Sequence, residues 1–554
     1  MKNKFILFVL ILFASGVASG QNFTEILGRP TTTTITVSIL FDQQAEVYWE
    51  LGTSPGNYTI TTSTFTAVSD SAFEADFPSL SPNTKYYYKT RYRLAGTSGI
   101  FLSGIEHTFH TQRPAGSTYK FAIEADPHLD TNTNYSSYTL TLQNILAKNP
   151  DFLIDLGDNF MSEKLPVQSQ TQNEITNRHR LYRPFYSTAC HSVPLYLVLG
   201  NHEGENGWLL NGSANSMPVI AANTRKLFYP NPIPNSFYSG DTIPENFVGL
   251  RENYYSWEWG NALFVVLDPY WYTVSKPDWG WTLGEDQYNW YKNTVTNSQA
   301  KFKFVFCHQL VGGDGTNGRG GTEFAHLWEM GGYNLDSTWG FTSFRPGWVK
   351  PVHTIMVENN VNIFFHGHDH FYGKQDLDGV VYQEVPQPSS KNITNISGLQ
   401  YGYTNGIFLP SRGYLLVTIT DSSAKVDYIR TYLPSEENTT RHNGDIGHTY
   451  TLTSITTGLT ENDEFSGFTL EQNYPNPFNQ ETTIKYQLQT TNVVQLILYD
   501  ILGREIRTLV NQNQNPGNYS VFMKPGELNL KEGIYFYKLN CGNYSKSLKM
   551  VYYK

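Results

Sequence analysis

Cysteine, positive charge and long apolar runs are all scarce in this chain of 554 residues. Its three cysteines, Cys190, Cys307 and Cys541, lie far apart, so they predict neither a disulfide framework nor a Cys-x-x-Cys metal site. With 39 Lys+Arg against 49 Asp+Glu the formal net charge is −10, which argues against a nucleic-acid-binding patch or an anionic membrane partner. No apolar stretch reaches the roughly 20 residues that cross a bilayer, so we expect no transmembrane segment.

Aromatic residues, by contrast, are abundant, and they indicate a folded chain. The 38 Tyr and 33 Phe are too many for a disordered protein. At roughly 100–200 residues per domain, the length predicts about three to five domains. Residues 1–20 combine basic Lys2 and Lys4 with a short apolar run and small residues from Ala14 onward, which is typical of an export signal. We therefore predict a Sec signal peptide over residues 1–20.

The segment that follows, residues 22–113, has the period-2 alternation of a half-buried sheet, as in TTTITVSILF and AEVYWEL. Its sequence LSPNTKYYY, from Leu80 to Tyr88, resembles the tyrosine corner of fibronectin type III domains. With Trp49 as a candidate core residue, we expect a fibronectin type III-like β-sandwich. Because the segment holds no cluster of His, Cys or carboxylates, we expect it to pack rather than to catalyse.

From Tyr119 onward, five apolar runs each end abruptly in residues that can bind metals. The run ends are Asp126-Pro-His128, Gly157-Asp158-Asn159, Gly200-Asn201-His202-Glu203, His308 and His366-Gly367-His368-Asp369-His370. Helices are predicted between the runs, over residues 138–147 and 286–296. In α/β sheets the functional loops gather at the carboxyl ends of the strands, so these residues are expected to converge.

The residue types at these run ends suit first-row divalent or trivalent metals rather than calcium, which prefers oxygen ligands. Asp126 and His128 are two residues apart, so in a continuing strand they would point to the same face. Gly157 lets the chain turn, which leaves Asp158 free to bridge two ions. Two ions about 3.5–4 Å apart can generate a hydroxide and hold both ends of a displacement at phosphorus. Asn201 and His202 are adjacent, and we expect their side chains to diverge.

The blocks D-x-H, G-D, G-N-H-E, H and G-H-x-H resemble the calcineurin-like metallophosphoesterase superfamily, over residues 118–432. The resemblance implies a four-layer α/β/β/α sandwich with two metal ions. One metal would be held by Asp126, His128, Asp158 and His370, and the other by Asp158, Asn201, His308 and His368. Asp158 and His202 are then the catalytic candidates, with His202 stabilising the phosphoryl group or protonating the leaving oxygen. Glu203 would orient His202 or lie behind it.

The fibronectin-like segment narrows the resemblance to purple acid phosphatases, with two departures. Those enzymes have a Tyr three residues after the Gly-Asp aspartate, where this chain has Met161. Their first block also lacks the imidazole that this chain has at His128. An imidazole in place of a phenolate favours Fe, Zn or Mn in divalent or mixed-valence pairs, and no purple colour is expected.

Other residues near these blocks have a structural and a functional interpretation. The loop of residues 312–321 (GGDGTNGRGG) could bring backbone amides and Arg319 to a phosphate, or it could be flexible with a solvated Arg319. Arg319 and Asn201 are the candidate substrate-binding residues. His366, Asp155 and Cys307 are interpreted as structural.

Residues 433–465 are polar and Thr-rich, and they predict a linker. Residues 466–554 are rich in predicted strands, which cover residues 482–489, 493–499, 519–523, 533–539 and 545–553. The sequences FTLEQNYPNPFN and YDILGRE resemble the C-terminal sorting domain of type IX secretion substrates. The alternative is an ordinary carbohydrate-binding or adhesion sandwich. A sorting domain after a signal peptide implies the type IX machinery as a partner, and a secreted or cell-surface protein.

The sequence thus predicts a multidomain chain: an N-terminal β-sandwich, a central α/β metallophosphoesterase domain and a small C-terminal β-sandwich. The predicted function is hydrolysis of small phosphate esters by a metal-bound hydroxide, most simply as an acid-phosphatase-like phosphomonoesterase. The alternatives are a phosphodiesterase or nucleotidase on the same scaffold, and a surface binding protein whose catalytic domain is inactive.

Overall fold

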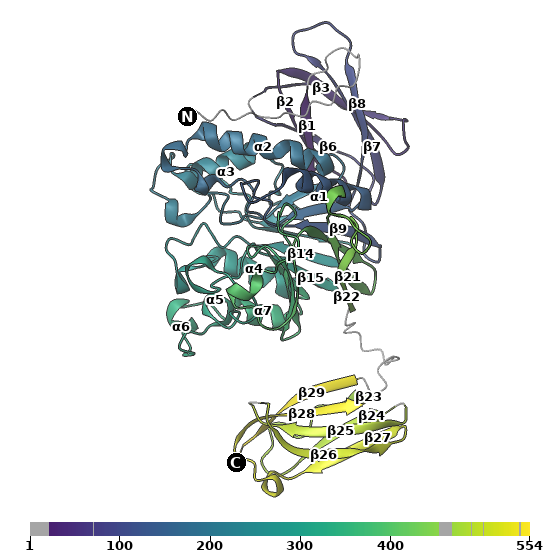
Figure 1. The fold of residues 1–554 in the computed structure, drawn as a ribbon, viewed down its shortest axis with the longest axis vertical. Coiled ribbons are helices and arrows are strands. Elements are labelled where there is room, and N and C mark those ends of the chain that lie inside the picture. The colour runs from purple at the N-terminus through teal and green to yellow at the C-terminus, as the bar shows by residue number, and fades with distance from the viewer. Residues whose placement is uncertain are drawn as a thin grey trace. The chain divides into compact units, whose positions relative to one another are not determined.

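The computed structural model describes residues 22–69, 71–453, 468–488, 490–501, 503–541 and 544–553. It divides into two compact units, with the boundary between Thr456 and Thr457 (Figure 1). The predicted signal peptide of residues 1–20 lies outside the described residues.

The first unit begins with a β-sandwich, in which alternating apolar residues face a shared core. One sheet has the order β1-β2-β6 and the other β4-β3-β7-β8, with β5 paired to β3. The strands are β1 (Phe23–Gly28), β2 (Ile35–Phe41), β3 (Ala45–Gly52), β4 (Ile60–Thr61), β5 (Phe65–Ala67), β6 (Phe73–Phe77), β7 (Lys85–Leu94) and β8 (Leu102–His110). Trp49 is fully buried in this core. The Tyr86 hydroxyl accepts a hydrogen bond from Ser81 N at 2.8 Å, which is the contact of a tyrosine corner.

Two further sheets of the first unit pack face to face. Their orders are β11-β10-β9-β20-β21-β22 and β12-β13-β14-β15-β16-β18-β17-β19. The six-stranded sheet contains β9 (Tyr119–Glu124), β10 (Phe152–Asp155), β11 (Leu195–Leu197), β20 (Gly413–Ile419), β21 (Ser423–Arg430) and β22 (Ile446–Thr453). The eight-stranded sheet contains β12 (Ser239–Gly240), β13 (Tyr255–Trp259), β14 (Ala262–Val266), β15 (Phe302–Phe306), β16 (Ile363–His366), β17 (Tyr372–Leu377), β18 (Val380–Glu384) and β19 (Ile407–Leu409).

Helices cover the outer faces of these two sheets, which gives four layers in α/β/β/α order (Figure 1). Tyr138 of α1 and Tyr182 of α2 pack on the six-stranded sheet, and Tyr288 of α4 and Ile355 of α7 pack on the eight-stranded sheet. The helices are α1 (Tyr135–Lys148), α2 (Gln172–Cys190), α3 (Met217–Phe228), α4 (Glu285–Asn297), α5 (Trp328–Gly331), α6 (Phe341–Phe344) and α7 (Val352–Glu358). The predicted helices at residues 138–147 and 286–296 correspond to α1 and α4.

Parallel pairing brings the loops that follow the central strands to common edges of the sheets. β9, β10 and β11 are parallel neighbours, and Glu124, Asp155 and Leu197 lie at the ends of these strands. β14, β15 and β16 are likewise parallel, with Phe306 opposite Phe365. The loops after these strands therefore leave their sheets side by side.

A buried arginine joins the N-terminal sandwich to the helices of the central layers. Arg183 of α2 donates hydrogen bonds to the Thr24 hydroxyl at 3.0 Å and to the Ser38 carbonyl at 2.9 Å. Its guanidinium also contacts the carbonyl of Phe228 at the end of α3. Because a buried charge needs such partners, Arg183 fixes the packing of β1 and β2 against α2 and α3.

The prediction of a linker over residues 433–465 is wrong at residues 446–453. Residues Ile446–Thr453 form β22, the edge strand of the six-stranded sheet, paired with β21. The stretch alternates threonines with Tyr450 and Leu452, and these two residues pack on the core between the sheets. An edge strand needs only one apolar face, so a Thr-rich sequence suffices. Residues 454–465 lie outside the described residues.

The second unit is a small β-sandwich with its own core. Its sheets have the orders β23-β24-β27 and β26-β25-β28-β29. The strands are β23 (Phe468–Leu470), β24 (Thr482–Leu488), β25 (Asn492–Tyr499), β26 (Glu505–Gln514), β27 (Gly517–Met523), β28 (Gly533–Cys541) and β29 (Tyr544–Tyr552). Ile484, Leu496 and Tyr537 are buried between the two sheets.

Candidate metal centre

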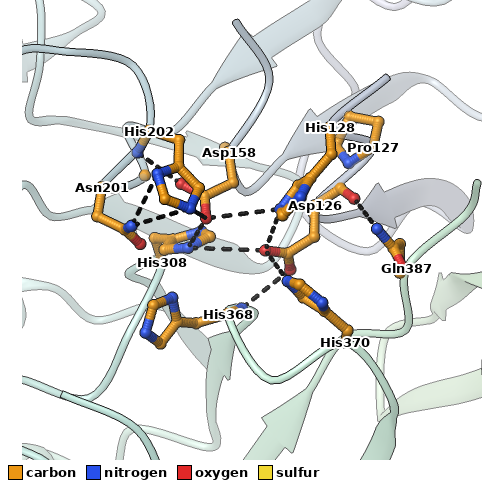
Figure 2. A network of polar contacts seen from close by, with 12 residues as sticks. Asp126, Pro127, His128, Asp158, Asn201, His202, His308, His368, His370 and Gln387 are labelled. Carbon is orange, nitrogen blue, oxygen red and sulfur yellow. Dashed lines mark hydrogen bonds and ion pairs between the residues drawn. The ribbon is translucent and has the colours of Figure 1, made fainter. Parts of the chain in front are cut away.

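Two groups of side chains converge at the carboxyl ends of the central strands (Figure 2). One group is Asp126, His128 and His370, and the other is Asp158, His308 and His368. Within each group the candidate ligand atoms lie within 4.8 Å of one another. All six residues were predicted from the sequence as metal ligands, and the fold brings them to one place from loops of both central sheets.

The backbone of these loops is unusual and explains how the side chains converge. Asp126, Asp158 and His368 have φ values of 59°, 61° and 79°, and His128 and His370 share this left-handed conformation. Such conformations are strained in residues other than glycine and cluster at functional sites. The argument that Asp126 and His128 share a face of a continuing strand is therefore wrong, because β9 ends at Glu124. Turns after the strands, and not the alternation of side chains along a strand, direct these side chains into the site.

The two carboxylates lie between imidazoles from both sheets. Asp126 Oδ1 is 3.3 Å from His370 Nε2 and 3.5 Å from His128 Nε2. Asp158 Oδ2 is 3.1 Å from His308 Nε2 and 3.7 Å from His128 Nε2. Asp158 thus faces a member of each group, which is the placement that a bridging ligand requires.

Six buried atoms through which the predicted ligands could bind a metal have no hydrogen-bond partner among the described residues. They are Asp126 Oδ1, His128 Nε2, Asp158 Oδ2, Asn201 Oδ1, His308 Nε2 and His368 Nδ1. Buried polar atoms are rarely left without a partner, so each such atom calls for an explanation. A set of carboxylate oxygens, imidazole nitrogens and an amide oxygen fits divalent first-row metals.

The imidazoles are oriented by their outer nitrogens. His308 Nδ1 is 2.8 Å from the carbonyl of Leu156, and His368 Nε2 is 2.8 Å from the carbonyl of Asn317. Because a carbonyl only accepts, each of these nitrogens donates its proton, and the other ring nitrogen presents a lone pair to the centre.

The electrostatics of the site favour ionised carboxylates. Burial alone would raise the pKa of Asp126, but His370 and His308 outweigh it and hold the pKa well below its usual value. The pKa of Asp158 is lowered in the same way, with His202 and His308 opposing the effect of burial. Burial would lower the pKa of His308, yet Asp158 and Asp126 raise it to about 9. The ionised carboxylates are therefore stabilised by nearby positive charge, which bound metal ions could provide in place of protonated imidazoles.

His202 lies at the edge of the two groups. Its Nε2 is 3.7 Å from Asp158 Oδ2, and its Nδ1 contacts the carboxylate of Glu163. The expectation that Asn201 and His202 diverge is wrong: Asn201 Nδ2 is 3.1 Å from His202 Nδ1, because both residues lie in a turn. Glu163 was not singled out in the sequence, where it is an ordinary Glu five residues after Asp158.

Glu203 lies behind the site, and within the part of the chain that the structure describes its carboxylate forms no hydrogen bond or ion pair with the His202 ring, whose Nδ1 contacts Glu163 instead. Its carboxylate accepts hydrogen bonds from the backbone N–H groups of Asp158 at 3.1 Å and Asn159 at 2.6 Å, and it contacts Gly200 N. Burial, with the charge of Asp158, raises the pKa of Glu203 to about 8. This side chain ties the Gly-Asp and Gly-Asn-His-Glu loops together.

The remaining residues singled out in the sequence lie around the site. Arg319 donates hydrogen bonds of 2.7 Å to the His368 carbonyl and to Asp369 Oδ1. His366 Nδ1 is 2.9 Å from Glu384 Oε2 inside the core, which fits its structural interpretation. Cys307 is fully buried, and Met161 is buried with a left-handed backbone. Arg319 is thus a neighbour of a candidate ligand with part of its guanidinium already engaged.

Comparison with known proteins agrees with this geometry. Residues 119–372 match the family model of calcineurin-like phosphoesterases, and residues 472–553 match that of the secretion system C-terminal sorting domain. The chain therefore carries a calcineurin-like phosphoesterase domain and a type IX secretion sorting domain. The sorting domain indicates that the protein is secreted or lies at the cell surface.

Two solved structures share the fold of the chain. PhoD superposes with a TM-score of 0.56 at 16% identity, over 78% of this chain and 90% of its own. The purple acid phosphatase PPD1 from yellow lupin (Lupinus luteus) seeds has a TM-score of 0.50 at 16% identity, over 77% of this chain and 74% of its own. At such identities the likeness concerns the fold alone. No curated protein sequence matches the chain. Within the described residues, none of the helices has the length and apolar character needed to cross a membrane.

Proposed function

We propose that the protein is a dinuclear-metal phosphomonoesterase that acts on small phosphate esters outside the cell. The observation that supports this proposal is the convergence of six buried ligand atoms that have no hydrogen-bond partner among the described residues. A catalytically inactive binding protein would have no need to keep every donor atom of such a set.

Each ion would have four protein ligands, with Asp158 shared. The first set is Asp126, His128, Asp158 and His370, and the second is Asp158, Asn201, His308 and His368. Fe, Zn or Mn suits both sets. When bound, two such ions supply an activated water and neutralise negative charge on the phosphoryl group.

His202 is the proposed acid or hydrogen-bond donor for the leaving oxygen. Its ring lies beside Asp158 without belonging to either ligand group. The Glu163 carboxylate accepts at Nδ1, which holds the ring in place and leaves Nε2 to carry the proton toward the substrate. Arg319 is the proposed contact to a phosphate oxygen, from its place beside His368.

The test combines metal analysis with a panel of phosphate monoesters and diesters, using the purified full chain. Asp158→Asn keeps the shape of the side chain but removes the negative charge between two cations. We expect it to lose at least one ion per chain and to lower kcat by more than about 10²-fold. Asp421→Asn, which alters an exposed carboxylate paired with Lys301, is the matched control and should retain both ions.

Full metal content with near wild-type kcat in Asp158→Asn would contradict the assigned role. A wild-type preference for diesters or for nucleotides would instead replace the phosphomonoesterase by a phosphodiesterase or nucleotidase on the same site. Wild-type protein that binds two ions and hydrolyses no member of the panel would contradict the enzymatic function itself.

A further inference from the structure

The loops that carry the first ligand group have an unusual backbone. Asp126 and His128, which follow β9, have φ values of 59° and 54°, and His370, which follows β16, has a φ of 65°. Residues other than glycine persist in this left-handed conformation only when the surrounding structure holds them there. The ligands of this group therefore depend on contacts from outside their own loops.

Two buried side chains hold carbonyl groups of these loops. Gln387 Nε2 donates a hydrogen bond to the Asp126 carbonyl at 2.9 Å (Figure 2). Ser411 Oγ donates to the His370 carbonyl at 2.7 Å, and it accepts from Gln387 N at 3.1 Å. Gln387 and Ser411, which we call the carbonyl clamp, are 6% and 2% exposed. Their hydrogen bonds therefore form one buried chain from the first loop to the second, and burial strengthens each of them.

The carbonyl clamp connects the two central sheets. Gln387 lies in the segment that follows β18 of the eight-stranded sheet, and Ser411 lies between β19 of that sheet and β20 of the six-stranded sheet. Asp126, by contrast, follows β9 of the six-stranded sheet. Ser389, two residues after Gln387, adds a hydrogen bond of 2.6 Å from its Oγ to the Pro127 carbonyl. These contacts thus fix ligand loops from the two sheets relative to each other.

The second ligand group is held by different contacts. The imidazoles of His308 and His368 donate to the carbonyls of Leu156 and Asn317, each at 2.8 Å. Within the described residues, the carbonyl clamp forms no hydrogen bond with a member of this group. The Asp126 carboxylate links the two groups, because its Oδ2 accepts from His368 N at 2.9 Å. The clamp itself acts on the first group alone.

We propose that Gln387 and Ser411 are positioning residues for the first metal site, and that they set its affinity without touching the ion. They keep the ligand atoms of Asp126, His128 and His370 within 4.8 Å of one another. Without the carbonyl clamp the strained loops would relax, and each binding event would have to bring the three ligands together again. This inference rests on the proposed function, because it requires an ion on this ligand set.

The experiment is a calorimetric titration of Mn²⁺ into the full chain after a chelator has removed its metals. His370→Ala and His308→Ala show which of the two binding events belongs to the first site and which to the second. Gln387→Met removes the amide donor but keeps a side chain of similar volume. We expect it to raise the Kd of the first event about 10–100-fold and that of the second less than about threefold. Ser411→Ala should act alike, and the double variant should lose less than the product of the two factors, because both hydrogen bonds belong to one chain.

Gln287→Met on α4 is the matched control, because buried Gln287 Nε2 likewise donates to a loop carbonyl, that of Asp268 at 2.7 Å. It should lower the free energy of unfolding in urea and leave both Kd values unchanged. Gln387→Asn, whose amide is one methylene too short to reach the Asp126 carbonyl, repeats the test with a milder change.

The positioning role is overturned if wild-type protein binds two ions and the clamp variants weaken both events equally or weaken neither. Wild-type protein that binds fewer than two ions would contradict the proposed dinuclear centre, and the positioning role with it.

Discussion

The Asp126 and Asp158 carboxylates each face imidazoles that come from different sheets of the first unit. His128 follows β9 of the six-stranded sheet, while His308 follows β15 of the eight-stranded sheet. Since both carboxylates are buried and their pKa values are held low, they keep their negative charge at any pH at which the enzyme would work. The ligand groups are therefore charged before any metal arrives, which favours binding of cations.

Substitutions at His202 and Glu163 should affect the chemical step without affecting metal binding. We expect His202→Ala to lower kcat by about 10²–10⁴, because general acids typically contribute that factor, while both ions stay bound. The loss should be smaller for aryl phosphates, whose leaving oxygens need little protonation. Glu163→Gln should show the same dependence on the leaving group with a smaller loss. Steady-state kinetics with aryl and alkyl phosphates, paired with metal analysis, measure these effects.

Glu203→Gln is the comparison variant for His202 and Glu163. Glu203 braces the loops of Asp158 and Gly200, so its loss should reduce activity toward aryl and alkyl phosphates alike. The role of His202 as leaving-group acid fails if His202→Ala removes an ion, or if it affects both kinds of substrate equally.

For individual residues, the sequence predicted which side chains come together at the site but not the backbone conformation that directs them there. The seven proposed ligands follow apolar runs, and the carboxyl ends of strands in parallel sheets bring such residues together. The left-handed backbone of Asp126 and His128 gave no signal, because these residues are not glycines. Glu163 could not be found either, since its contact with His202 depends on the turn at Met161.

Between elements, a pair of stacked histidines joins the N-terminal sandwich to α2. His107 of β8 and His191, the residue after α2, have ring centroids 3.9 Å apart. Burial, with a further contribution from His191, lowers the pKa of His107 to about 3, and burial lowers that of His191 to about 4. Both rings are therefore neutral in the folded protein over most of the acidic range.

This pair predicts an acid-sensitive contact. Unfolded histidines have pKa values near 6.5, so below that pH the unfolded chain binds more protons and the folded state loses stability until about pH 4. Burial raises the pKa of Glu25 to about 7, so the folded chain binds this proton before the unfolded chain does. Glu25 therefore stabilises the folded state as the pH falls from 7 to 4.5, which opposes the effect of the two histidines. Between pH 7 and 4.5, we expect the free energy of unfolding of the double variant His107→Gln/His191→Gln to fall by about 1–2 kcal/mol less than that of the wild type. Urea unfolding followed by tryptophan fluorescence measures both values.

His326→Gln, which alters an exposed histidine, is the control for the stacked pair and should follow the wild type. Equal loss of stability in the double variant and the wild type would show that the stacked pair does not set the acid sensitivity of this contact.

Some strands at the edges of their sheets were missed in the sequence. β22 was assigned to a linker, and β26 (Glu505–Gln514) was not predicted at all. Both lie at the edge of their sheets and keep many polar residues, so apolar alternation is weak. Their place in a sheet is decided by hydrogen bonds to β21 and β25, which no pattern within the strand itself records. Among the strands inside the two central sheets, β9, β10, β15 and β16 stood out as apolar runs, whereas β14, β18, β20 and β21 were not predicted.

For the whole molecule, the division into two units separates the candidate metal centre from the sorting domain. Every proposed ligand lies in the first unit, whereas the residues that match the sorting-domain family lie in the second. Each unit has its own hydrophobic core. Long-range hydrogen bonds such as those of Arg183 to Thr24 and Ser38 could not be predicted from the sequence, because no local pattern indicates which distant residues will be partners.

Deleting residues from 466 onward tests this separation. In a recombinant protein we expect kcat/KM to stay within about twofold of the full chain, because the first unit keeps its core and all proposed ligands. In the native host the truncated enzyme should remain in the periplasm, since the sorting domain that directs it through the outer membrane is gone. Cell fractionation with an activity assay measures both effects. Full-length Asp158→Asn is the control, because it should reach the surface or medium without being active. A truncated enzyme that still appears outside the cell would show that export does not depend on the second unit.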